Sequence, residues 1–127
     1  MEIVVVIGGL AAIAWIIVTR SRRLLRENAE MAQKAADQGD ASAQFLLGLM
    51  YADGHGVPRD YVKAMHWWHM AAEQGLANAQ STLGFMYANG KGGVPKDEAK
   101  AVYWYEQAAE QGDAKAQAML EKLGAGK

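Results

Sequence analysis

The feature that most constrains this chain is an internal repeat. Residues 39–74 align with residues 75–111, with one extra glycine in the second copy, and 21 of the 36 aligned positions are identical. A match of this length between adjacent segments indicates a repeat architecture, in which each unit packs mainly on its neighbours. We therefore expect a stack of similar units instead of a domain with one central core.

Each unit has the pattern of two helices joined by a glycine loop. In the first unit, small and apolar residues recur at the i, i+4, i+7, i+8 spacing over residues 40–52, which predicts an amphipathic helix A. Glycines and Val57-Pro58 then interrupt the pattern, and Asp60 is placed to cap a helix B over residues 61–74. The sequence thus predicts an all-α fold with two full repeats, 39–74 and 75–111, within residues 39–112.

Half-units flank the two full repeats. Residues 35–39 repeat the end of helix B, and residues 113–120 repeat the start of helix A. About three units are needed to bury a continuous core, and the two half-units supply the third. We predict a basic segment with a capping helix at residues 21–38, its helix B at 28–38 running on from the N-terminal segment with little break. A capping helix and tail should occupy residues 113–127.

The shared pattern resembles a known family. It combines Leu-Gly, Tyr, Gly-x-Gly-Val, Asp, Lys-Ala, Trp and Ala-Ala-x-Gln-Gly at fixed spacing, and it covers about residues 28 to 123. This is similar to the Sel-one-like repeat, a relative of the tetratricopeptide repeat. The resemblance implies a short right-handed α-solenoid with helix A on the concave face, and a scaffold or adaptor role. Disulfide-stapled relatives differ, because this chain has no cysteine.

Residues that recur at the period are interpreted as architecture. Glycine inside a helix costs about 1 kcal/mol relative to alanine, so the glycines within helix A predict close approach of a neighbouring helix. The architectural residues are Leu47, Gly48, Tyr51, Gly54, Trp67 and Ala71, then Leu83, Gly84, Tyr87, Gly90, Trp104 and Ala108.

A binding site is expected on helix A, mostly where the two units differ. The candidate partner contacts are Gln44, Phe45, Leu46, Leu49, Gln80 and Phe85. Gln44 and Gln80 keep an amide that could hydrogen-bond a peptide backbone. Phe45 and Leu46 are apolar where the second unit is polar. They indicate either a contact patch or burial against the preceding helix, and the sequence leaves both open.

The N-terminal segment predicts a membrane anchor. Ile3 to Val18 is uncharged, and as a helix it spans roughly 24 Å, a short transmembrane length. We predict an anchor at residues 1–20, with residues 3–19 in the membrane. Four arginines follow between residues 20 and 26, so the positive-inside rule places the body in the cytoplasm. A cleaved signal peptide, giving a periplasmic or secreted protein, and a buried core helix are the alternatives.

Composition and motifs argue against other classes of function. Residues 27–127 carry a net charge of −4, which gives no reason to bind nucleic acid. His66 and His69 lack the further ligands that a metal site needs, so a solvated or partner-facing surface is favoured there. No Ser-His-Asp set or HExxH motif is present in the sequence. We therefore predict no enzymatic activity and no cofactor.

The combined prediction is a membrane-tethered adaptor that binds a protein or peptide on the concave surface of helix A. The alternative is a structural subunit of a larger membrane protein complex.

Overall fold

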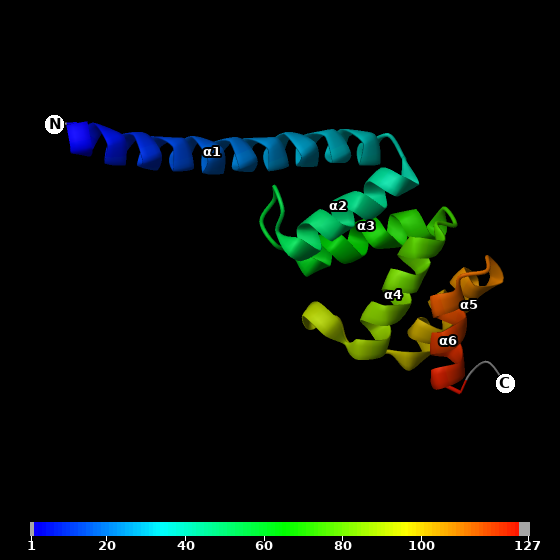
Figure 1. Cartoon of the computed structure of the whole chain (residues 1–127). Coiled ribbons are helices and arrows are strands. Elements are labelled where there is room, and N and C mark those ends of the chain that lie inside the picture. Colours follow the sequence, from blue (N-terminus) through cyan, green and yellow to red (C-terminus); the bar gives the residue numbers. More distant parts are fainter. Residues whose placement is uncertain (1, 125–127) are drawn as a thin grey trace.

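The computed structural model describes the backbone of residues 2–124 and the side chains of residues 10–124. Within residues 2–124 the chain forms six α-helices and one 3₁₀ turn, without a strand, which confirms the all-α prediction (Figure 1). The elements are α1 (Glu2–Asp37), α2 (Ala41–Asp53), α3 (Tyr61–Glu73), α4 (Ala77–Asn89), η1 (Lys91–Gly93), α5 (Glu98–Glu110) and α6 (Ala114–Lys122).

The helices stack as repeated pairs. The pair α2–α3 is the first repeat and the pair α4–α5 is the second. Helix α6 is a third helix A, and the C-terminal part of α1 supplies the helix B that precedes α2. Each helix packs on the next one along the chain, and α4 also contacts α6 across the unit boundary. The predicted solenoid of helix-turn-helix repeats is therefore confirmed.

Short polar caps fix where the helices begin. Asp40, Asp60, Asp97 and Asp113 each precede a helix and accept a hydrogen bond from a backbone N–H in its first turn. Such a cap stabilises a helix by about 1 kcal/mol. At the other end, Gly54 and Gly90 close α2 and α4 with left-handed φ angles of 73° and 61°, which glycine adopts without steric cost.

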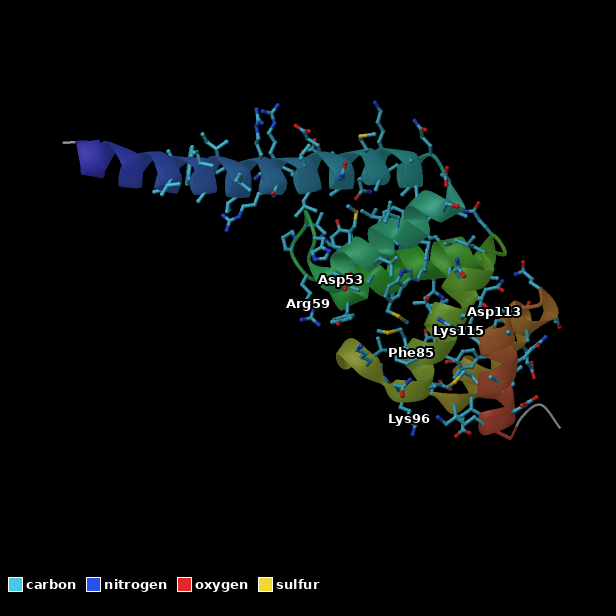
Figure 2. All side chains as sticks on the ribbon, in the orientation of Figure 1. Asp53, Arg59, Phe85, Lys96, Asp113 and Lys115 are labelled. Atoms are coloured by element: carbon cyan, nitrogen blue, oxygen red, sulfur yellow. The ribbon has the colours of Figure 1, made fainter. Side chains whose placement is uncertain are left out.

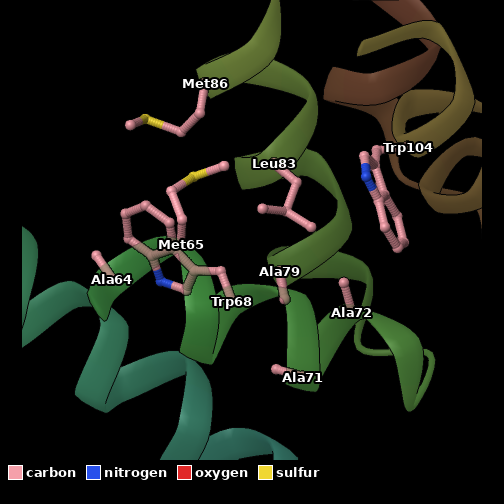
Figure 3. Packing of buried hydrophobic residues seen from close by; sticks show 9 residues of the cluster. All are labelled: Ala64, Met65, Trp68, Ala71, Ala72, Ala79, Leu83, Met86 and Trp104. Atoms are coloured by element: carbon pink, nitrogen blue, oxygen red, sulfur yellow. The ribbon is translucent and has the colours of Figure 1, made fainter. Parts of the chain in front are cut away.

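The core is divided among the junctions between helices. The central cluster lies between α3 and α4, and Figure 3 shows Leu83 between the Trp68 side and Trp104. A smaller cluster joins α5 to α6, and a third joins α1 to α2. Many of the buried residues are alanines, which let helix backbones approach closely. The central cluster consists of Ala64, Met65, Trp68, Ala71, Ala72, Ala79, Leu83, Met86 and Trp104.

Helix α1 has two different halves. Its C-terminal half packs on the first repeat, where a Cβ at Gly56 would strike the carbonyl oxygen of Leu25. Its N-terminal half projects away from the other helices as a straight rod (Figure 1). The apolar side chains from Leu10 to Val18 on that rod are exposed. The helix runs unbroken into the predicted capping helix. The side chains of residues 10–18 do not pack on the repeats, which contradicts the alternative of a buried core helix over those residues.

The membrane prediction finds no support in the structure. Among the side chains described, no helix is both long enough and apolar enough to cross a bilayer. The span predicted at residues 3–19 lies partly outside that region, because residues 3–9 precede the first side chain described.

Candidate protein-binding surface

The glycines of helix A are sites of close helix packing. A Cβ at Gly48 would strike the indole of Trp68, and a Cβ at Gly84 would lie 2.7 Å from Cδ1 of Tyr105. The predicted close approach is confirmed in both units. The aromatic ring against each glycine follows the periodic tryptophan by one residue. Trp67 itself is only half-buried, whereas its counterpart Trp104 is buried in the central cluster.

The two glutamines predicted to contact a partner are internal. Gln44 and Gln80 are 1% and 5% exposed. The Nε2 group of Gln44 donates to the Ala36 carbonyl at 3.2 Å, and its Oε1 accepts from Gln74 at 2.8 Å. Gln80 repeats both bonds with Ala72 and Gln111. These amides are therefore not placed to contact a partner, contrary to the prediction from the sequence. Each instead links its helix A by hydrogen bonds to the helix B on either side.

The apolar candidates divide into one packed residue and three surface residues. Phe45 is half-buried against the central cluster, and its carbonyl accepts a hydrogen bond from Trp68 Nε1 at 3.2 Å. Leu46, Leu49 and Phe85 are 48%, 36% and 45% exposed. Leu49 and Phe85 occupy the same position in their units, so one apolar position stays at the surface of both helices A.

A pocket that the sequence analysis missed lies beside Phe85. It has a volume of about 400 Å³ and is walled by α4, α5 and α6. The walls include Ser81, Thr82, Phe85, Tyr105, Lys115 and Met119. Figure 2 labels Phe85 on α4 and Lys115 near the start of α6. The sequence did carry a signal for this pocket, because the small Ser81 stands at the position that the larger Phe45 occupies in the first unit.

Polar contacts define the edge of this pocket. Ser81 Oγ donates to Asp113 Oδ2 at 2.6 Å, and this hydrogen bond is the main cause that lowers the pKa of Asp113. Asp113 also caps α6 by accepting from Ala116 N. The Lys91 ammonium lies 5.7 Å from the centroid of the Phe85 ring. Burial raises the pKa of the Tyr105 phenol above its ordinary value.

Of the two histidines predicted at a solvated or partner-facing surface, His66 is exposed and His69 packs between the repeats. A ring nitrogen of His69 lies 2.9 Å from the Tyr87 hydroxyl, and the ring packs edge-on against Tyr87 and Trp104. Burial is the largest cause that lowers the pKa of His69. His69 is thus part of the junction between the two repeats, while His66 is exposed. Among the described residues, no group of three or more possible ligands could hold a metal ion.

This arrangement of repeats matches a known family. The Sel1 repeat matches residues 29–40, 41–76 and 77–113. The chain belongs to the Sel1 repeat family. Members of this family generally mediate protein–protein interactions and are generally not enzymes. No match was found among curated proteins.

Two solved structures show the same fold. A Sel1 repeat protein from Oxalobacter formigenes is 41% identical, with a TM-score of 0.71, over 78% of this chain and 41% of that chain. A protective antigen of uropathogenic Escherichia coli strains, displaying an SLR fold, is 40% identical, with a TM-score of 0.70, over 77% of this chain and 21% of that chain. The chain thus spans less than half the length of either Sel1 repeat relative.

Proposed function

We propose that this Sel1 repeat chain is a non-enzymatic scaffold that binds a protein segment across helices α2 and α4. The observation that carries the proposal is the exposure of Leu46, Leu49 and Phe85 on these two helices. Leu46 and Leu49 are neighbours on one face of α2, and adjacent exposed apolar side chains are typical of an interaction site.

The charge distribution supports the same face. Helix α4 carries no charged residue, and Asp53 is the only one on α2. Charged residues are depleted at the centre of protein interfaces because their desolvation costs free energy. Helices α3 and α5, by contrast, carry several acidic and basic side chains. With two full repeats, the face would accept a short helix or an extended peptide.

Charge substitutions on this face test the proposal. Leu49→Asp and Phe85→Asp should each abolish capture of the partner, because a carboxylate would have to be buried in an apolar contact. Val62→Asp is the matched control, since Val62 is 80% exposed on α3, a helix B. Capture that survives both substitutions on helix A, or that is lost only with the control, would contradict the proposal.

We further propose that α1 tethers the scaffold to a membrane, with the repeats on the cytoplasmic side. Support comes from the exposed apolar residues Leu10 to Val18, which the solenoid leaves uncovered, and from the uncharged residues 3–9 that precede them. The exposed arginines 20, 22, 23 and 26 would then meet anionic lipid, each worth about 1 kcal/mol near the surface.

Carbonate extraction and protease protection test the tether together. A C-terminal tag should remain in the carbonate-resistant pellet and be protected in intact spheroplasts. Release by carbonate would contradict the tether, and digestion in intact spheroplasts would place the repeats outside. Extraction in mild detergent as a large particle would instead favour the competing proposal, a structural subunit of a membrane complex.

A further inference from the structure

The pocket beside Phe85 has an apolar floor and a cationic edge. Phe85, Tyr105 and Met119 supply aromatic and thioether surface. A volume of about 400 Å³ is enough for one large apolar side chain and part of its neighbours. The space is open because the side chain of Ser81 is small. The first unit has the bulky Phe45 at the same position.

Three lysines lie on or near the walls of the pocket, and Lys115 is one of the residues that line it. On α6, Lys115, Ala118, Met119 and Lys122 follow the i, i+3, i+4, i+7 spacing, so both lysines lie on the helix face that carries Met119. Lys91 adds a third ammonium beside Phe85. Helix α4 opposite is uncharged, and Glu121 falls on a different side of α6 by its spacing.

Asp113, the carboxylate that bonds to the pocket residue Ser81, is already engaged. Asp113 accepts hydrogen bonds from Ser81 Oγ and from Ala116 N, and both lower its pKa. The positive charge of Lys115 also lowers the pKa of Asp113, but it is the smallest of the causes. No salt bridge joins the two side chains in the described part of the chain, so the Lys115 ammonium can also approach a ligand.

We infer that the pocket between α4 and α6 seats an apolar side chain of an acidic protein segment, with carboxylates of that segment beside Lys115. The inference rests on the proposed function, and it names the chemistry of the partner. The apolar anchor supplies affinity, and the lysines select segments of negative charge.

The test uses the full chain in detergent micelles and short blocked peptides. In the probe peptide a single leucine stands between aspartates. One control peptide replaces the aspartates with lysines, and the other replaces the leucine with serine. Amide and methyl NMR signals should shift at Ser81, Phe85 and Met119 with the probe peptide alone. Absence of these shifts, or equal shifts with either control peptide, would overturn the inference.

Variants of the chain sharpen the test. Lys115→Glu should weaken binding of the probe peptide roughly five- to tenfold. Lys34→Glu, the same charge change at an exposed site on α1, should alter binding by less than about twofold. Ser81→Phe should fill the pocket and abolish the shifts, and the first unit shows that this position accepts a phenylalanine. Unchanged binding by Lys115→Glu would overturn the inference even if Ser81→Phe failed to fold.

Failure of the inference and failure of the proposed function give different results. If the scaffold proposal is wrong, Leu49→Asp captures the cellular partner as well as the wild type does. If only the pocket inference is wrong, Leu49→Asp loses capture whereas Lys115→Glu retains it.

Discussion

The two repeats share one backbone plan but differ in how helix A meets its surroundings. Both carry the buried glutamine, the internal glycine and the aromatic ring against that glycine. In the first unit Phe45 packs against the core, and Trp68 hydrogen-bonds its carbonyl. In the second unit Ser81 hydrogen-bonds to Asp113, the N-cap residue of α6, and a pocket lies beside Tyr105. Positions that the fold requires are kept, and positions beside them are free to form a site.

The largest expected effect concerns the aromatic pairs. Trp68→Ala should lower the free energy of unfolding by about 3–5 kcal/mol, because it leaves a cavity in the central cluster. Trp67→Ala should cost roughly 1–2 kcal/mol, since Trp67 is half-buried against the cluster between α1 and α2. Trp104→Ala, at the same repeat position as Trp67, should cost more than Trp67→Ala because Trp104 is buried. Urea titration followed by circular dichroism measures all three, and equal costs would contradict this view of the core.

The internal glycines should separate the units next. Gly48→Ala should destabilise by about 1–3 kcal/mol, because the new methyl group strikes a buried indole that the Phe45 carbonyl holds in place. Gly84→Ala should cost less than Gly48→Ala, since the Tyr105 ring borders the pocket and can shift into it. The same titration measures both variants. A larger cost at Gly84 would show that the pocket gives Tyr105 no room.

The buried glutamines should make the units behave alike. Gln44→Leu and Gln80→Leu should each cost about 1–3 kcal/mol, because each removes one hydrogen bond to a backbone carbonyl and one to a glutamine amide. Thermal unfolding of the two variants provides the comparison. Wild-type stability in either variant would mean that the fold does not need the glutamine amide at that position. That glutamine would then again be a candidate for partner contact.

The smallest effect is a dependence on pH that only the first unit provides. The pKa of His69 is lowered by burial, whereas the second unit has the exposed Glu106 at this position. The unfolded chain binds a proton at His69 near pH 6.5, and the folded chain binds it only at lower pH. Stability should therefore fall as the pH drops from 6.5 through the folded pKa. His69→Gln should reduce this fall in urea midpoints measured at pH 7.5 and pH 5.5, and an unchanged fall would contradict the assignment.

The sequence predicted the repeats well because their signals are local. The glycines that end α2 and α4, the aspartate before α3 and the half-units at residues 28–38 and 113–120 all follow from spacing and backbone chemistry. The site was harder to predict. A recurring glutamine suits a peptide contact or a buried bridge equally well, and only the neighbouring helices decide between them.

Other parts of the site depend on packing between units. Trp67 recurs as Trp104, so periodicity pointed to it as an architectural residue, yet the adjacent Trp68 is the one that contacts Gly48. The pocket depends on what α6 places opposite α4, and no spacing within a single unit reveals this.

Site-specific photocrosslinking tests the central claim, that helix A binds a protein partner, most directly. A photoreactive phenylalanine analogue would replace Leu49 or Phe85 on helix A, and Val62 or Tyr103 on helix B, all of which are exposed. Irradiation of intact cells should join the chain to one discrete partner from the two helix A positions and not from the two helix B positions. Crosslinks only from helix B, or the same products from all four positions, would contradict the claim.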